Sequence, residues 1–538
     1  MTYFTTSKIF LVPSFELDVK ESEKIDKFLL FLENSQVGNV ITKYVKNNTS
    51  KGGRPNCNYY RLFAAILFGF AFDKYTLREI EKACKFDLRY ITIMEQTFVN
   101  YSTISKFINN VIVPNEKEVF SLICKQLKKE LNITFEDAFI DGTKIEANAN
   151  KYKFVWKPLT YHEKLSIKAY ELIFKYNLLQ KQTTETHIRS SIIATSLSNL
   201  ENIKSTINEK EYTSISNALS SMLSKVLEYE SKEEICGPNR NSYYKTDHDA
   251  TAMCLKSDYY SGLGTNMHAA YNIQSLVIKG FVFSYYVSQS RTDFSDFIPV
   301  LEAFYLNYNT FPERVCADSG YGNLINYRYI KEHNIENYIK YSSWEGNITG
   351  RSPDCYYLND DETIKCLNGN IGQEINIENR HPKKADAVFF KITGCNSCEF
   401  KSYCKRFMKT QNEDFKIFEV VKELQFYKQE ATKNLLSTKG IEIRVNRSIQ
   451  VEGVFGIVKQ DYKRNRFNRR GKNKISTEVM LYFLGLNIAK LFRYYETGEL
   501  NKYWESPENL SPQEIKKPSA KRLNKKGLKM NNDAYKKG

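Results

Sequence analysis

The sequence predicts an α/β fold in which a mixed five-stranded sheet, with helices on its faces, follows an all-α N-terminal region. Three observations support this prediction. Helical spacing dominates residues 18–130, five strand-like runs lie between residues 138 and 341, and helical spacing resumes at about residue 415. Two long polar stretches between these elements are predicted to be insertions, one helical and one rich in cysteine.

Composition narrows the class of protein. The chain has 538 residues, 42% of them hydrophobic, which is enough for several domains or for one domain with large insertions. Because it lacks a run of about 20 apolar residues and a hydrophobic signal segment, we expect neither a membrane span nor secretion. Eleven cysteines, an odd number, fit a reducing cytoplasm better than a disulfide framework.

The charge balance favours a polyanionic partner. Lysine and arginine outnumber aspartate and glutamate by 78 to 62, which gives a net charge of +16. Part of this excess lies in residues 501–538, a basic tail that we expect to be disordered. Basic residues also cluster in residues 459–474, inside the predicted fold, and these favour nucleic-acid binding over a basic tail alone.

Residues 1–130 are predicted to form a helical N-terminal domain. Thr76 is an expected N-cap with Glu79 three residues later, the spacing of a capping box. A further helix is expected at Ser102 and Thr103, after a turn near Asn100. Short helices separated by tight turns suit a helix-turn-helix reader of DNA ends, but a plain helical bundle explains the pattern equally well.

Residues 131–500 are predicted to form the sheet-containing domain. A polar stretch at 157–240 is predicted to be an inserted helical hairpin, and residues 342–420 a cysteine-rich insertion. The expected strands are residues 138–140, 268–274, 279–286, 314–317 and 337–341. The apolar positions expected to pair the inserted helices are Leu165, Ile173, Leu178, Leu197, Leu200, Ile203 and Leu223.

Three carboxylates carry the clearest functional signal. Asp141 and Asp318 each follow a short apolar run, so both are expected at the tips of buried strands that can be neighbours. Alone, such an aspartate is usually an N-cap or turn residue. Glu452 lies in a segment with helical spacing. Together, three such carboxylates can hold two hard cations such as Mg²⁺ or Mn²⁺, roughly 4 Å apart, the arrangement that clamps a phosphodiester during in-line displacement.

Basic residues flank the glutamate. Lys459 lies seven residues after Glu452, two helical turns, so we expect it on the same helix face and near a phosphate. The apolar side of this helix is expected to include Ile449, Phe455 and Val458. An ordinary solvated face is the alternative. The predicted contacts to the DNA backbone are Arg447, Lys459, Lys463, Arg464, Arg466, Arg469 and Arg470.

These segments resemble those of bacterial insertion-sequence transposases of the DDE class, which have a ribonuclease-H-like catalytic domain. The resemblance covers GRPNCNYYRLFAAILFGFAFDKYTLREIEKACKFDLRY, FIDGTKIEANANKYKFVWK, YKTDHDATAM, ADSGYGN and RSIQVEGVFGIVKQDYKRNRFNRRGKNKISTEVMLYFLGLNIAKL. Related chains often carry Tyr-x₂-Arg-x₃-Glu-x₆-Lys in the last block. Here Glu452-x₆-Lys459 is kept, but Val445 and Ser448 stand at the tyrosine and arginine positions, and Arg447 is displaced by one residue.

The resemblance implies a function, partners and a metal. Asp141, Asp318 and Glu452 would be the metal-binding triad of an enzyme that cleaves the ends of an insertion sequence and transfers the strand into target DNA. The expected partners are double-stranded DNA, as terminal inverted repeats and as target, and a second copy of the chain, in the bacterial cytoplasm at the nucleoid. The alternatives are a metal-dependent nuclease without strand transfer and a DNA-binding protein whose catalysis has decayed.

The cysteine-rich insertion has the spacing of a zinc site. Cys395-x₂-Cys398-x₅-Cys404, with Cys366 upstream, can supply four thiolates for a structural Zn²⁺, and Cys355 could replace Cys366. Unligated cysteines are the alternative, and the resemblance to transposases extends to these four residues. Trp156 and Trp344 could stack on an unpaired base, although packing is the expected role of each.

Overall fold

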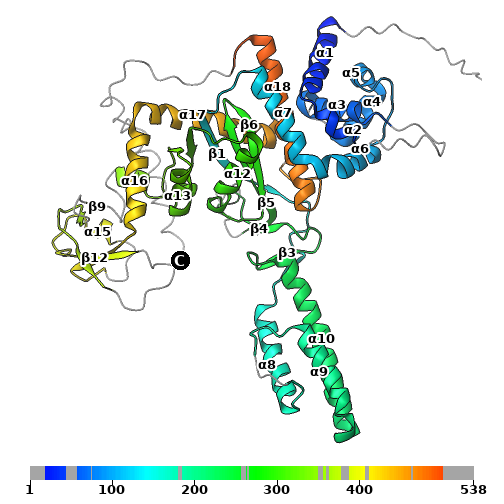
Figure 1. The fold of residues 1–538 in the computed structure, drawn as a ribbon. Coiled ribbons are helices and arrows are strands. Elements are labelled where there is room, and N and C mark those ends of the chain that lie inside the picture. Colours follow the sequence, from blue (N-terminus) through cyan, green and yellow to red (C-terminus); the bar gives the residue numbers. More distant parts are fainter. Residues whose placement is uncertain are drawn as a thin grey trace, which may run out of the picture.

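The structure is a computed structural model in which residues 18–43, 57–73, 76–179, 184–255, 258, 262, 266–348, 356–358, 363–376, 387–405, 411–461 and 465–500 are described. Its centre is a mixed six-stranded sheet with the order β4-β5-β1-β7-β8, and β6 also pairs with β5 (Figure 1). The strands are β1 (Asp137–Glu146), β4 (Thr251–Met253), β5 (His268–Ile278), β6 (Phe281–Ser288), β7 (Arg314–Ala317) and β8 (Glu336–Asn337).

The predicted fold class is confirmed, but the bounds of most strands differ from the prediction: β5 and β6, for example, both end later than the runs at 268–274 and 279–286. The run at 138–140 is only part of β1, which continues to Glu146 because β5 pairs with it antiparallel from Phe139↔Val277 to Glu146↔Ala270. The short β4, which pairs with the start of β5, was not predicted. Of the run at 337–341 only the first residue is in β8, whereas the predicted strand at 314–317 coincides with β7.

Two helices, α17 and α12, pack against the central strands of the sheet. The helix α17 contacts β1, β5 and β7, while α12 contacts β5 and β6. The helices that follow the first strands are α12 (Phe297–Tyr308), α13 (Leu324–Glu332), α14 (Trp344–Ile348), α16 (Lys422–Leu436), α17 (Thr438–Gly456) and α18 (Lys472–Thr497). Short 3₁₀ turns are η5 (Phe294–Asp296) and η6 (Ser319–Tyr321), and a π-helical turn, η8 (Ile457–Asp461), continues α17.

The N-terminal helices share one hydrophobic core with the sheet. The helix α18 lies between them and contacts η1, α3, α7 and β6, so buried residues from Ile25 to Phe492 form one continuous cluster. The elements are α1 (Val19–Asn34), α2 (Val37–Thr42), α3 (Tyr59–Phe68), η1 (Gly69–Asp73), α4 (Leu77–Phe86), α5 (Leu88–Ile93), α6 (Tyr101–Phe107), η2 (Ile108–Ile112), η3 (Val113–Asn115) and α7 (Glu116–Glu130).

Two details of the helical region bear on the predictions. The capping box is present, because Glu79 N donates to Thr76 Oγ1 at 3.4 Å and Thr76 N donates to Glu79 Oε2 at 2.6 Å. By length and composition α18 could cross a membrane, but 83% of its most apolar window is buried inside the protein. It therefore occupies the position of a core helix.

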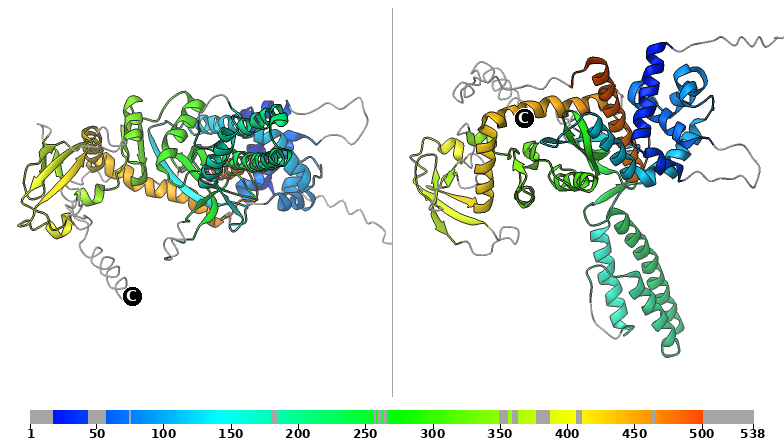
Figure 2. Two further views of the ribbon diagram at one scale, coloured as in Figure 1. Left: turned by 90° about the horizontal axis from the view of Figure 1, so that it is seen from below. Right: turned by 45° about the horizontal axis from the view of Figure 1, so that its top comes forward.

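The helical insertion leaves the sheet between β2 (Phe154–Trp156) and β3 (Ser242–Tyr244), which pair with each other. It projects away from the sheet in Figure 1 and in the right view of Figure 2. Three helices form it, not the predicted hairpin: α8 (Leu159–Lys175), α9 (Ser190–Asn202) and α10 (Glu209–Cys236), with a 3₁₀ turn η4 (Lys204–Thr206). All seven apolar positions predicted for it lie in its separate hydrophobic core or pack against that core.

The cysteine-rich insertion packs around small antiparallel sheets beside α16 (Figure 1). Its core is formed by Ile364, Phe390, Ile392, Phe418 and Val420, and Cys366 and Cys404 pack against it. The elements are β9 (Tyr356–Leu358), β10 (Ile364–Cys366), β11 (Gln373–Ile375), β12 (Val388–Thr393), α15 (Lys401–Cys404) and β13 (Phe415–Val420).

Candidate active site and nucleic-acid interface

The sheet register brings two of the predicted carboxylates together. Strands β1 and β7 are parallel, and their last paired residues are Ile140 and Ala317. Asp141 and Asp318 are the next residue on each strand, so they lie side by side where this pairing ends. The expectation that both residues lie at strand tips is correct for Asp318 but wrong for Asp141, because antiparallel pairing with β5 extends β1 beyond it.

Asp141 lies in a charged and partly buried environment. The pKa of its carboxyl is raised from 3.8 to about 6, chiefly by burial and also by the carboxylates of Asp318 and Asp293, and the Arg447 guanidinium opposes this rise. The cause is thus removal from water together with a concentration of negative charge. Such a site favours a bound cation, which relieves the repulsion between the carboxylates.

Asp318 is exposed and has a local structural role as well. Its carboxylate accepts a hydrogen bond from Ser319 N at 2.8 Å and caps the 3₁₀ turn η6. This is the capping role expected of an isolated aspartate, and it fixes one carboxylate oxygen. The side chain of Asp318 therefore helps to fix its own backbone next to Asp141.

Asp293 is a site residue that the sequence reasoning missed. It precedes η5, and its Oδ1 accepts hydrogen bonds from Asn272 Nδ2 at 2.7 Å and Gln274 Nε2 at 3.0 Å. Both amides are fully buried on β5. Tyr321, in the turn after Asp318, donates to Gln274 Oε1. Two amides at alternate positions of a predicted strand were the available signal, since buried amides need partners.

Gly142 allows this amide to lie beside Asp141. A Cβ atom at Gly142 would lie 2.3 Å from Gln274 Nε2 and 2.7 Å from its Oε1. Gln274 is tied to Tyr321 and Asp293, so it cannot easily move aside. Glycine is therefore required at position 142, because the side chain of Gln274 on the neighbouring strand β5 occupies the space that a Cβ atom would need.

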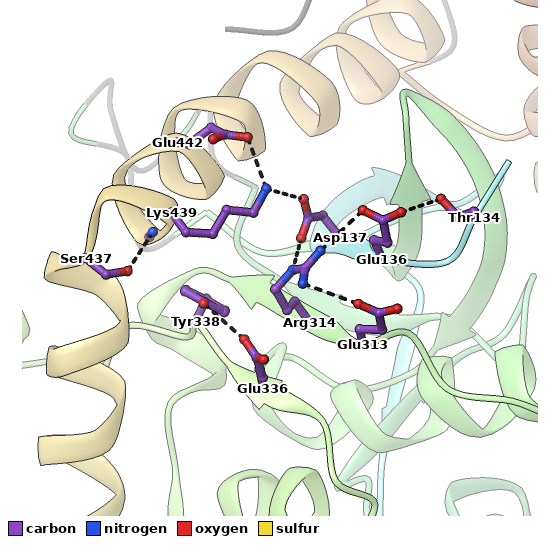
Figure 3. A network of polar contacts seen from close by, with 11 residues as sticks. Thr134, Glu136, Asp137, Glu313, Arg314, Glu336, Tyr338, Ser437, Lys439 and Glu442 are labelled. Atoms are coloured by element: carbon purple, nitrogen blue, oxygen red, sulfur yellow. Dashed lines mark hydrogen bonds and ion pairs between the residues drawn. The ribbon is translucent and has the colours of Figure 1, made fainter. Parts of the chain in front are cut away.

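A network of ion pairs fixes the start of α17 against β1 (Figure 3). Lys439 Nζ lies 3.1 Å from Asp137 Oδ2, and Arg314 also pairs with Asp137. Asp137 and Arg314 are direct partners across β1 and β7. The helix is capped by Ser437, whose Oγ accepts from Gly440 N at 3.0 Å. The Lys439–Asp137 pair places the start of α17 beside the first residue of β1. Further along the helix, Arg447 is close enough to Asp141 to lower the pKa of its carboxyl.

Glu452 lies on α17, and its side chain is outside the described residues. Its neighbours define the buried side of the helix. Val451 is fully buried, and Gln450 Oε1 accepts from Gly280 N at 2.8 Å. The predicted apolar side was partly wrong, because Phe455 and Val458 are buried but Ile449 is 46% exposed. The reason is that polar Gln450 is turned inward to bind the backbone of the sheet.

Lys459 reaches the same strand as Asp141. Its Nζ donates to Thr143 Oγ1, and Thr143 is two residues after Asp141 on β1. Alternate residues share one face of a strand and lie about 7 Å apart, so the lysine contacts the face of β1 that carries Asp141. Lys459 is in the π-helical turn η8, so its phase relative to Glu452 differs from the two α-helical turns predicted.

Three of the predicted DNA-binding arginines hold a loop in place. Arg466 donates to the carbonyls of Ala147 and Ala149, and Arg470 donates to that of Asn148 at 2.8 Å. Arg469 NH1 donates to Asn109 Oδ1 at 2.8 Å, and burial lowers its pKa. These contacts join the loop to the end of β1 and to η2. Lys463 and Arg464 lie outside the described residues.

The same loop borders a pocket of about 680 Å³ beneath the N-terminal helices. Its walls include Thr76 and Arg78 at the start of α4, and Tyr101 and Ser105 on α6. Asn468, Arg469, Arg470 and Lys474 line the opposite side. Basic side chains from regions almost 400 residues apart in sequence therefore face one opening.

The four predicted zinc ligands line one small cavity of about 30 Å³. Cys395 and Cys398 lie in the turn after β12, Cys404 ends α15 and Cys366 ends β10. Lys416, which is 4% exposed, donates to Cys404 Sγ at 3.3 Å. Among the described residues, no three cysteine sulfurs lie within 4.8 Å of one another. Cys355 is outside those residues, as is the basic tail.

The two tryptophans have different environments. Trp344 is 6% exposed and packed between Lys340 and Arg444, as expected. Trp156 is 62% exposed on β2, with the ring of Phe154 at 5.4 Å, so the expected packing of this residue is wrong. The two-stranded sheet of β2 and β3, with three residues in each strand, is too small to cover its own aromatic side chains.

An N-terminal helical region, a curled mixed sheet and acidic residues at its centre define a ribonuclease-H-like DDE domain. Residues 15–110 match a family model described as "Transposase domain (DUF772)", and residues 366–492 match one described as "Transposase DDE domain". The two matches together indicate an insertion-sequence DDE transposase. The second match includes Glu452, Lys459 and the four cysteines, and begins after Asp141 and Asp318. No curated protein matched the sequence.

Proposed function

We propose that this transposase cleaves phosphodiester bonds at the ends of an insertion sequence and joins the freed 3′-hydroxyl to target DNA, with Asp141, Asp318 and Glu452 as its catalytic carboxylates. The observation that carries the proposal is the register of β1 and β7, which puts Asp141 beside Asp318. Arg447 and Lys459 then approach the pair from α17 and η8. Opposite charges converge there from elements distant in sequence, as phosphoryl transfer requires.

The donor set fits hard divalent cations. Carboxylate oxygens are the ligands that Mg²⁺ and Mn²⁺ prefer, and Asp141 lies near two further carboxylates, those of Asp318 and Asp293. Two such ions held by Asp141, Asp318 and Glu452 would supply charge neutralisation at the phosphate and a more acidic water. Asp293, bonded to Asn272 and Gln274, adds negative charge beside Asp141 and keeps the buried amides in place.

The chain's own cations would orient the scissile phosphate. Lys459 is a flexible donor whose ammonium rests on Thr143 in the absence of DNA, and a phosphate oxygen can replace that hydroxyl. Arg447, partly exposed on α17, can contact a second oxygen. Positioning and neutralisation of charge account for most of the catalysis in this reaction class.

We also propose that the N-terminal helices, residues 1–130, bind the element ends. The basic pocket between α4, α6 and the loop at Asn468–Arg470 is open to a DNA backbone. Trp156, which is exposed, is available to stack on an unpaired base. Cleavage at two ends and joining at one target require two active sites, so a dimer on DNA in the cytoplasm is the expected assembly. The four cysteines would hold one structural zinc ion.

The decisive experiment uses end DNA taken from the inverted repeats that flank the gene. Full-length protein, Mg²⁺ and end-containing DNA are incubated with a supercoiled target. Joined end–target products support transposition, while cleavage without joining identifies a nuclease instead. Binding of the ends without cleavage in Mg²⁺ or Mn²⁺ would identify a DNA-binding protein without catalysis and overturn the proposal.

A further inference from the structure

Two histidines and a glutamate meet at the root of the helical insertion, on elements that take no part in the candidate active site. His162 is in the first turn of α8, His187 lies just before α9, and Glu233 is in the last turn of α10. One ligand atom from each lies within 4.8 Å of the other two. We propose that these three residues bind a divalent transition-metal ion such as Zn²⁺.

The hydrogen bonds of His162 orient one nitrogen toward the proposed ion. Its Nε2 lies 2.9 Å from the carbonyl oxygen of Ile188, and a carbonyl only accepts, so Nε2 carries a proton. In the neutral ring Nδ1 then presents a lone pair, and it lies 2.9 Å from Glu233 Oε1. A lone pair facing a carboxylate is repulsive, so this contact needs either a second proton on the ring or a metal ion bound by both atoms. A backbone carbonyl on the far nitrogen is the usual arrangement of a metal-binding histidine.

His187 distinguishes a metal ion from a second proton on His162. Its Nδ1 lies 3.7 Å from the same Glu233 oxygen, and its ring stacks on that of His162 with centroids 4.6 Å apart and planes 11° apart. A proton shared by His162 and Glu233 needs no second imidazole. Two imidazole nitrogens and a carboxylate oxygen within 4.8 Å of one another are a donor set of Zn²⁺.

The distances are compatible with one ion. Bonds of about 2.0–2.1 Å allow ligand atoms to be up to about 4 Å apart, which includes the separations of 2.9 and 3.7 Å. An imidazole binds a metal ion in the plane of its ring, so His187 must turn out of its stack on His162 to reach the ion, and its side chain, 28% exposed, has room to turn. His162 is 1% exposed and already fixed by Ile188. Water can occupy the fourth position from the exposed side of His187.

The ion would hold three segments together where the insertion joins the sheet. Other contacts converge there: Lys157 Nζ donates to Gly237 O at 3.0 Å, and Ser190 N donates to Glu230 Oε1 at 2.9 Å. These polar contacts connect the strand before α8, the start of α9 and the end of α10. A metal ion at this point would fix the direction of the insertion relative to β2 and β3, a structural role.

The test measures metal content in matched variants of the full-length protein. Wild type, His187→Gln and Glu233→Gln are stripped with a chelator, reloaded with Zn²⁺ and dialysed. Each variant should hold about one zinc ion fewer per chain than wild type. All three proteins keep the same cysteines, so zinc held by cysteine cancels in the difference. His333→Gln is the control, because His333 contacts Tyr329 outside this cluster and should not change the count.

A second measurement reports on the insertion itself. Zn²⁺ should slow limited proteolysis between α8 and α10 by about tenfold in wild type, and should not do so in either variant, because a ligand has been lost. Equal zinc content in wild type and both variants would overturn the proposal and leave a protonated His162–Glu233 ion pair. If the variants misfold, X-ray absorption of zinc-loaded wild type decides: nitrogen and oxygen ligands support the site, and sulfur ligands alone exclude it.

Discussion

Lys459, in the π-helical turn after α17, donates a hydrogen bond to Thr143, two residues beyond Asp141 on β1. This contact links the segment after Glu452 to the strand that carries the first carboxylate. It also gives the lysine a defined resting position, from which its ammonium can transfer to a phosphate oxygen.

Lys459→Ala should lower the cleavage rate by about 100-fold at saturating DNA, because the charge acts on the transition state as well as on binding. Single-turnover cleavage measures this rate. The matched control is Lys225→Ala, at an exposed position on α10, which should change only the salt dependence of binding. Equal rates for wild type and Lys459→Ala would assign Lys459 to an ordinary solvated face.

Asp141→Asn, Asp318→Asn and Glu452→Gln should each abolish cleavage and leave binding of end DNA within about threefold of wild type. Metal ligands serve the chemical step, whereas affinity for DNA comes mainly from lysine and arginine. Cleavage and gel-shift assays on the same preparations separate the two effects. Normal cleavage by any one variant would remove that residue from the proposed triad.

Gly142→Ala should reduce both stability and cleavage. The new Cβ would lie 2.3 Å from Gln274 Nε2, so the amide that supports Asp293 must move, at a cost of about 1–3 kcal/mol in the free energy of unfolding. Gly320→Ala is the matched control, because no atom lies within 4 Å of a Cβ at that position. Chemical denaturation of both variants tests the difference. A Gly142→Ala protein as stable and active as Gly320→Ala would show that the Gln274 side chain can move aside at little cost in free energy.

Asp296 should make stability depend on pH. Burial raises the pKa of its carboxyl from 3.8 to about 6, so between these values the folded protein holds a proton that the unfolded chain has lost. Stability contributed by the protonated form is therefore lost as pH rises from about 4 through 6. Relative to wild type, Asp296→Asn should gain about 3 kcal/mol in unfolding free energy between pH 4 and pH 8. A constant difference across that range would contradict the assignment.

Cys395→Ser combined with Cys398→Ser should remove about one zinc ion per chain and destabilise the cysteine-rich insertion, because a structural zinc ion contributes folding free energy. Metal analysis of protein purified without chelators is the direct measurement. Cys236→Ser, at a buried position on α10, controls for the loss of a thiol and should leave the zinc content unchanged. Absence of sulfur-bound zinc from wild type would exclude the site.

Much of the architecture could be predicted from local patterns. The strand β7 and the capping box at Thr76 follow from short-range preferences that act within a few residues. The seven apolar positions of the helical insertion were also predictable, since burial follows helical spacing. The third helix of that insertion was missed because a period of apolar residues does not fix where a helix ends.

The sequence by itself determined the fold class, the candidate carboxylates and the basic segment beside them. Only the tertiary structure decided that β1 continues past Asp141, that Gln450 replaces Ile449 on the buried side of α17, and that Asp293 joins the site. It also decided that His162, His187 and Glu233 meet. These relationships depend on strand register and on contacts between residues far apart in the chain, which no local preference specifies.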